Sequence, residues 1–262
     1  MEIAKRKAER REAMAMREVR LYAGERVDDL QFHGMRIIQR ADAFRFGTDA
    51  VLLTDFAQPK SRETAVDLGT GTGAIALLMA MHHPNITVDA VELQPDIADM
   101  AWRSAYINEL DDRVRVHHMD MRDAPRLLGQ EKFSLVVCNP PYGRDGGALV
   151  NDNPALRTAR HEGGLTPDAV AEAAFRLLRY GGRFAVVFPA QRAYEMMRAM
   201  DDHHLAPKRV RTVHATAGRA PKLILIDAIK GGGSQLHWQD PLILAEADGS
   251  PTAEWKRIFE SY

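Results

Sequence analysis

The sequence predicts an α/β fold with a mostly parallel sheet that is covered by helices on both faces. Short apolar segments rich in β-branched residues alternate with amphipathic helical segments through most of the chain, as they do in such folds. In addition, the apolar segment 64–68 runs directly into the glycine turn Gly69-Thr-Gly-Thr-Gly73 and then into a helical segment. A strand, a glycine turn and a helix in this order form the first half of a Rossmann-like, nucleotide-binding unit.

The individual elements follow from periodicity and from turn residues. Residues 30–39, broken at Gly34, predict a hairpin, and Thr48 or Asp49 can cap the helix that follows. The core has seven predicted strands, at 64–68, 87–92, 113–119, 133–138, 183–188, 209–214 and 223–229, with an edge segment at 241–245. The predicted core helices are 74–80, 95–110, 166–179, which Gly181-Gly182 would end, and 191–200.

Three regions of the chain differ in composition. The first 20 residues carry seven Lys or Arg against four Glu, so residues 1–24 are expected to be an exposed charged helix or a frayed arm. A basic arm that contacts nucleic acid is the alternative. Residues 25–60 hold the hairpin and its helix, and residues 61–262 hold the core; together they form the main domain.

The overall composition excludes several classes of protein. The 262 residues are 45% hydrophobic and 27% charged, which is ordinary for a soluble globular protein. The net charge is −1, so a polyanionic partner must be held by a local patch. The single cysteine, Cys138, excludes an internal disulfide and is expected to pack inside a strand. No apolar stretch predicts a membrane span and no secretory signal is visible, so we expect a cytoplasmic protein without a membrane partner.

The glycine turn follows an acidic residue, Asp67, and its spacing is G-x-G-x-G rather than the dinucleotide pattern G-x-G-x-x-G. A carboxylate beside the turn would repel a diphosphate but attract the cationic amino group of an amino-acid moiety. This favours S-adenosylmethionine (SAM) over NAD as the cofactor. The candidate cofactor residues here are Asp67, Gly69, Thr70, Gly71 and Gly73.

Two further acidic residues end the next two predicted strands. Glu92 can accept both hydroxyls of a ribose, and Leu93 beside it is a further cofactor candidate. Asp120 can accept a hydrogen bond from the adenine amino group, with Met121 beside the ring. The alternatives are a solvated strand-end glutamate and a loop cap.

The tetrapeptide Asn139-Pro-Pro-Tyr142 follows the buried strand 133–138. Its prolines fix φ near about −65° and make the loop stiff, so the Asn139 side-chain carbonyl and the Pro140 backbone carbonyl can converge as acceptors for one NH2 group. Tyr142 offers a flat face on which a planar group can stack. The alternative is a plain Pro-Pro turn that closes the strand.

Parallel sheets bind ligands at the carboxyl ends of their strands, so Gly69, Glu92, Asp120 and Asn139 should line one edge. The polar loop 143–164 is longer than most loops in a compact domain and is expected to be a substrate loop or lid.

A basic segment follows near the C-terminus. Five Lys or Arg and no acidic residue lie between His203 and Ile226, and they form either a phosphate-binding patch or ordinary surface. The three adjacent His pairs lack the spacing of a zinc site, so no metal is expected.

With the glycine turn, the two acidic residues and Asn139-Pro-Pro-Tyr142, the chain resembles class I SAM-dependent amino methyltransferases. Three further segments, 45–53, 159–162 and 223–231, resemble the bacterial tRNA(Val) adenine-N6 methyltransferase family, and the likeness spans about residues 25–262. In this resemblance, Asn139-Pro-Pro-Tyr142 specifies methylation of an amino group, and the three further segments narrow the range of possible substrates.

The resemblance implies further roles. The segment 44–49 would close over the methionine end of SAM, and the substrate would be the adenine just 3′ of the tRNA anticodon. Phe46 and Thr48 then join the cofactor residues, and the substrate candidates are Tyr142, Arg160, His161, Lys208, Arg209 and Arg211. Methylation of a protein glutamine or of another base amino group stays open, as do a non-catalytic nucleotide-binding role and the oligomeric state.

Overall fold

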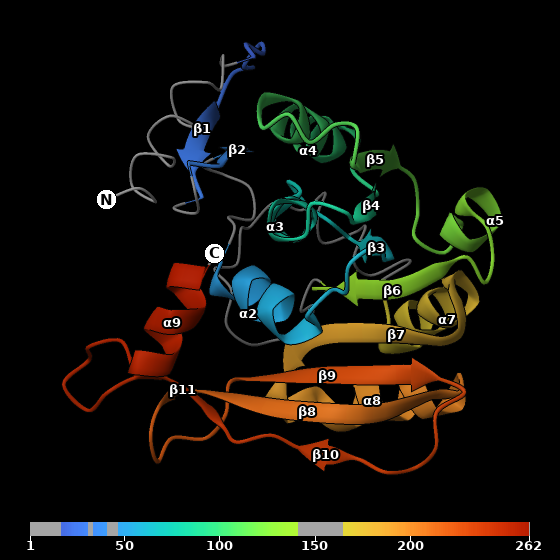
Figure 1. Cartoon of the computed structure of the whole chain (residues 1–262), viewed down its shortest axis with the longest axis vertical. Coiled ribbons are helices and arrows are strands. Elements are labelled where there is room, and N and C mark those ends of the chain that lie inside the picture. The colour runs from blue at the N-terminus through green and yellow to red at the C-terminus, as the bar shows by residue number, and fades with distance from the viewer. Residues whose placement is uncertain (1–16, 31–33, 41–46, 141–164, 262) are drawn as a thin grey trace, which may run out of the picture.

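The computed structural model describes residues 17–30, 34–40, 47–140 and 165–261 (Figure 1). Over these residues the central sheet has nine strands in the order β10-β8-β9-β7-β6-β3-β4-β5, and β11 also pairs with β8. The strands are β3 (Thr64–Leu68), β4 (Thr87–Glu92), β5 (Val114–His118), β6 (Phe133–Cys138), β7 (Leu178–Pro189), β8 (Leu205–Thr216), β9 (Leu223–Lys230), β10 (His237–Trp238) and β11 (Leu242–Ala245).

The count of seven strands was therefore wrong by two. Strand β11 is the predicted edge segment, and β10 has only two residues, too few to show an alternating pattern. Otherwise the expected architecture is confirmed. Strands β5, β4, β3, β6 and β7 are parallel, and β9 runs antiparallel between β7 and β8. The winding direction reverses between β3 and β6, and such a switch point is where open α/β sheets bind ligands.

Helices cover both faces of the sheet. One hydrophobic cluster joins the sheet to α2, α3, α4 and α9, and a second joins the other face to α5, α7 and α8. In Figure 1, α2 and α9 lie side by side, with the C-terminal end of the chain close to both. The helices are α2 (Thr48–Ala57), α3 (Ala74–His82), α4 (Pro95–Ile107), α5 (Ala124–Leu128), α7 (Pro167–Leu177), α8 (Ala193–Asp202) and α9 (Ala253–Ser261).

The N-terminal hairpin consists of β1 (Glu25–Asp29) and β2 (Arg36–Arg40), which pair antiparallel and pack against α4. A hairpin was expected, but its first strand ends before Leu30. Leu30 is buried and belongs to the connection, and its N–H donates to the Met35 carbonyl oxygen. A buried ion pair between Arg103 of α4 and Glu25, 2.7 Å, holds the hairpin in place.

Two local predictions about helix ends were wrong and one is confirmed. Thr166 caps α7 by accepting a hydrogen bond from the backbone N–H of Ala169, 3.1 Å. However, α7 ends before the glycine pair, which lies inside β7; a Cβ on Gly182 would stand 2.8 Å from the Arg179 carbonyl oxygen. Neither predicted residue caps α2, because Gly47 is the N-cap and Thr48 is already helical and exposed.

No described helix is both long enough and apolar enough to cross a membrane.

Candidate active site

The glycine turn between β3 and α3 is fixed to the neighbouring strand. The backbone N–H groups of Gly69 and Thr70 both donate to the Val91 carbonyl oxygen, at 2.9 Å. Gly73 has φ of +94°, in the left-handed region that favours glycine, and a Cβ there would just contact the Cβ of Ala101 on α4, at 3.4 Å. Gly71 has φ of +58° and a Cβ there would meet no atom within 4 Å. The turn therefore has open space above it.

Asp67 is fully buried beneath this turn. Its Oδ2 accepts a hydrogen bond from the Thr70 hydroxyl at 2.5 Å, whereas Oδ1 has no hydrogen-bond partner among the described residues. Burial raises the pKa of the Asp67 carboxyl to about 7. Hydrogen bonds from the Thr70 hydroxyl and from the Ala76 backbone N–H oppose the rise, and the Glu92 carboxylate adds to it. A buried carboxylate oxygen without a partner fits a cationic amino group at this turn.

Glu92 ends β4 and faces the turn, as predicted. Its Oε2 accepts a hydrogen bond from the Gly71 N–H at 3.0 Å, and its Oε1 accepts one from the Gln94 N–H at 2.9 Å. A carboxylate has about four lone-pair sites, so each oxygen can still accept a ribose hydroxyl. Leu93 next to it is a large apolar residue with 60% of its surface exposed, which suits a wall for an apolar ring.

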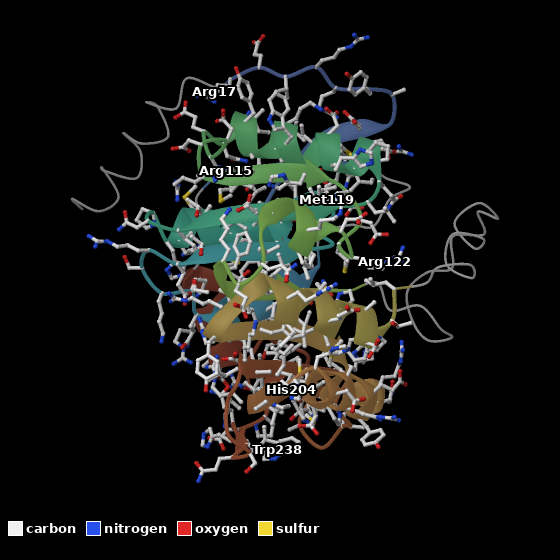
Figure 2. The ribbon with its side chains drawn as sticks, turned by 90° about the vertical axis from the view of Figure 1, so that its right-hand side faces the viewer. Arg17, Arg115, Met119, Arg122, His204 and Trp238 are labelled. Atoms are coloured by element: carbon white, nitrogen blue, oxygen red, sulfur yellow. The ribbon has the colours of Figure 1, made fainter. Side chains whose placement is uncertain are left out.

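Asp120 follows β5 and is held by a residue that the sequence predictions missed, Arg122. The Arg122 Nε lies 3.0 Å from both carboxylate oxygens, and the guanidinium holds the pKa of Asp120 below its usual range. Figure 2 shows Met119 and Arg122 near each other, on either side of Asp120 in the chain. Met121 packs over the turn, with its Cε 3.5 Å from the position of a Cβ on Gly69. In the sequence, the only signal for the pairing of Arg122 with Asp120 is that the arginine stands two residues after the aspartate.

Asn139 leaves the sheet beside the glycine turn. Cys138 and Leu68, the last residues of β6 and β3, pair in register, and the Cys138 thiol donates to the Leu68 carbonyl oxygen at 3.1 Å. Asn139 and Gly69 therefore start adjacent connections at the same edge. Asn139 is half-buried and Pro140 is buried. The four groups expected at the carboxyl ends of the strands thus lie along one edge, at the switch point.

Known proteins are similar to this chain over most of its length. The family model of the methyltransferase small domain matches residues 40–213. The chain belongs to this family. A tRNA1(Val) (adenine(37)-N6)-methyltransferase of Porphyromonas gingivalis is 30% identical over 243 residues, covering 90% of this chain and 94% of the relative. One from Pedobacter heparinus, with the same description, is 31% identical over 236 residues, covering 88% and 96%.

Solved structures agree on the fold of this methyltransferase. A predicted O-methyltransferase from Agrobacterium tumefaciens superposes with a TM-score of 0.67 at 22% identity, covering 81% of this chain and 96% of that one. TrmN from Thermus thermophilus superposes with a TM-score of 0.53 at 24% identity, covering 69% and 48%. The fold is that of class I SAM-dependent methyltransferases, and SAM is the cofactor that the turn and its acidic residues suit.

Several predicted site residues of the methyltransferase lie outside the described part of the chain. They are Phe46, Tyr142, Arg160 and His161, together with the whole of the expected substrate loop, 143–164.

The predicted substrate cations of the methyltransferase have partners within the protein. Arg209 pairs with Asp227 at 2.8 Å, and Arg211 pairs with Glu254 at 2.6 Å. The Lys208 ammonium donates to backbone carbonyls of the segment before β10. Arg209 and Arg211 line a cavity of about 350 Å³ between α2 and α9. These residues lie in the body of β8, and their role in substrate binding stays a prediction.

The described residues contain no group of three or more His, Cys, Asp or Glu side chains that could hold a metal ion. The expectation of a metal-free enzyme stays a prediction.

Proposed function

We propose that this methyltransferase transfers the methyl group of SAM to the exocyclic N6 of an adenine in the anticodon loop of tRNA(Val). The position of Asn139 carries the proposal, because its side-chain acceptor starts from the strand next to the glycine turn. The relatives that match nearly the whole chain are named for the same reaction. A tRNA substrate also puts the enzyme in the cytoplasm.

The residues of the turn would hold the cofactor. Asp67 would receive the amino group, Glu92 the ribose hydroxyls, and Asp120 the adenine amino group, with Leu93 and Met121 against the adenine ring. Asp120 must then share its oxygens between the adenine and Arg122, which already occupies both. Bound SAM supplies an electrophilic methyl group on its sulfonium.

The two acceptors of the tetrapeptide make the substrate nitrogen reactive. The amino lone pair of adenine is delocalised into the ring, which makes the amino group a poor nucleophile. The Asn139 side-chain carbonyl and the Pro140 backbone carbonyl accept hydrogen bonds from the two N–H groups of the adenine amino group. These hydrogen bonds favour a pyramidal nitrogen with a localised lone pair. The nitrogen becomes acidic as it gains the methyl group and then loses one proton to solvent, so positioning and electrostatics suffice and no strong base is needed beforehand.

A base must leave its stack to reach these acceptors, which costs a few kcal/mol. The bases of an RNA loop are already partly unstacked, so a loop is an easier substrate than a duplex. Tyr142, next to the acceptors in sequence, would offset part of the cost by stacking on the base, at roughly 1–3 kcal/mol.

The test is nucleoside mass spectrometry of unmodified tRNA(Val) incubated with the enzyme and SAM, which should reveal N6-methyladenosine. Asn139→Ala should abolish transfer and leave the SAM dissociation constant largely unchanged. Asn139→Asp keeps an acceptor oxygen and should retain part of the activity. Transfer by the alanine variant would refute the assigned chemistry, and absence of N6-methyladenosine with the wild type would refute the substrate.

A further inference from the structure

The sheet edge that carries Asn139 continues across β7, β9 and β8. Strand β7 ends in a short 3-10 helix, Ala190–Arg192, that leads into α8, and residues 217–222 connect β8 to β9. These two connections meet, because the Ala190 N–H donates to the Lys222 carbonyl oxygen at 3.0 Å. We call residues 190–194 and 217–222 together the recognition edge.

The recognition edge lies at the same end of the sheet as the methyl-transfer site. Cys138, just before Asn139, pairs with Val186 of β7, and Val186 pairs with Ile226 of β9. Strand β9 is therefore two strand spacings from β6, or about 10 Å. The basic residues in the body of β8 are one spacing further away. The register places Arg211 opposite Leu225, level with Asn139, whereas Lys222 lies three residues beyond Leu225. The recognition edge thus extends past the end of β6, on the side where Asn139 leaves the sheet.

The recognition edge carries two cations without a carboxylate partner. Arg219 and Lys222 are exposed, and neither forms an ion pair with any residue that the structure describes. The turn that bears them is ordered by hydrogen bonds: the Lys222 N–H donates to the Val213 carbonyl oxygen at 2.9 Å, and the His214 Nδ1 donates to the Arg219 carbonyl oxygen at 2.6 Å. Arg209, in contrast, is neutralised by Asp227. Lys208 also lacks a carboxylate partner, but its ammonium donates to the Gly233 and Gln235 carbonyl oxygens.

An exposed aromatic ring accompanies these cations. Tyr194, the second residue of α8, has 75% of its surface exposed, and its ring contacts no aromatic ring or cation among the described residues. Arg192, two residues earlier, already has partners within the protein: its guanidinium lies 5.2 Å from the centre of the Phe188 ring and pairs with Glu195 at 2.8 Å. Unpaired cations and an unpartnered aromatic ring, here on two connections that meet, are features that bind single-stranded nucleic acid.

We propose that the recognition edge binds the RNA loop on one side of the target adenine. Arg219 and Lys222 contact backbone phosphates, and Tyr194 stacks on a flanking base. This proposal rests on the proposed function, since it requires an RNA substrate. It assigns RNA contacts to two cations of the predicted basic segment, Arg219 and Lys222, and to Tyr194, which the sequence did not single out.

The test measures binding of the full-length variants to unmodified tRNA(Val) over a range of salt concentrations, together with methyl transfer and SAM affinity. Loss of two phosphate contacts in Arg219→Ala/Lys222→Ala should reduce the slope of log affinity against log salt by about 1.4, at about 0.7 per contact with single strands. Tyr194→Ala should weaken binding by about 5- to 150-fold, whereas Tyr194→Phe keeps the ring and should bind like the wild type. SAM affinity should not change.

Arg198→Ala is the matched control for charge, because Arg198 is an exposed cation of α8 that pairs with Asp202. It should leave the salt slope unchanged. The proposed role of the recognition edge is refuted if the double variant and Tyr194→Ala bind tRNA with wild-type affinity and salt slope. It is also refuted if Arg198→Ala reduces the salt slope as much as the double variant does. A wild-type enzyme that binds tRNA without methylating it refutes the proposed function alone, and one that does not bind tRNA refutes both.

Discussion

SAM affinity should depend on pH through the buried carboxyl of Asp67. Its pKa of about 7 means that about 3% of the enzyme carries the ionised carboxylate at pH 5.5 and half carries it at pH 7. The amino group of SAM stays protonated below about pH 7.7. If the ammonium binds only the ionised carboxylate, the SAM dissociation constant should fall by about 16-fold between pH 5.5 and pH 7.

Titration calorimetry with SAM across this range measures the effect, and Asp67→Asn is the matched variant. The amide cannot ionise, so its SAM affinity should be weak and independent of pH. A pH-independent affinity in the wild type, or the same dependence in Asp67→Asn, would contradict the assignment of Asp67 to the amino group.

The stability of the unliganded protein should show the opposite trend. The pKa of Asp67 is higher in the folded protein, about 7, than the usual aspartate value of 3.8, so the folded state binds the proton more tightly. The free energy of unfolding should therefore fall as pH rises from about 4 to about 7, by a few kcal/mol. Thermal unfolding without SAM checks this, and Asp67→Asn should remove this part of the decrease.

Two further predictions concern the cofactor and the basic strand. Glu92→Ala removes the acceptor for the ribose and for two backbone N–H groups, so it should weaken SAM binding by about 10- to 100-fold by calorimetry; an unchanged affinity would exclude a ribose contact. Arg209→Glu with Arg211→Glu should weaken tRNA binding in a filter assay without changing SAM affinity, and should also lower the unfolding temperature because new carboxylates face Asp227 and Glu254. Unchanged tRNA binding would assign both arginines to the fold alone.

The sequence was sufficient for those parts of the site that depend on local order. Asp67 and Glu92 lie at the carboxyl end of a strand and Asn139 directly follows one. The apolar pattern of each strand is plain, and parallel strands bring their carboxyl ends together. The glycine turn likewise follows from residue type, because Gly71 has a positive φ.

The pairing of charged side chains could not be predicted in the same way. Arg209 meets Asp227 because β8 and β9 pair antiparallel in one particular register, and that register is set by the packing of the whole sheet. The sequence shows only that no acidic residue lies near Arg209 along the chain. Similarly, the glycine pair after α7 resembles a helix terminator, but its close approach to other backbone atoms is a requirement of β7.

The only cysteine of the chain lies directly before the first methyl-transfer residue, and this gives the protein a built-in probe. Cys138 is fully buried, and burial raises the pKa of its thiol, so it should not react with thiol reagents in the folded state. Each labelling event requires the end of β6 to separate from β3. The labelling rate of the unmodified protein therefore reports how often the active-site edge opens, and comparison with SAM present measures how far the cofactor closes it.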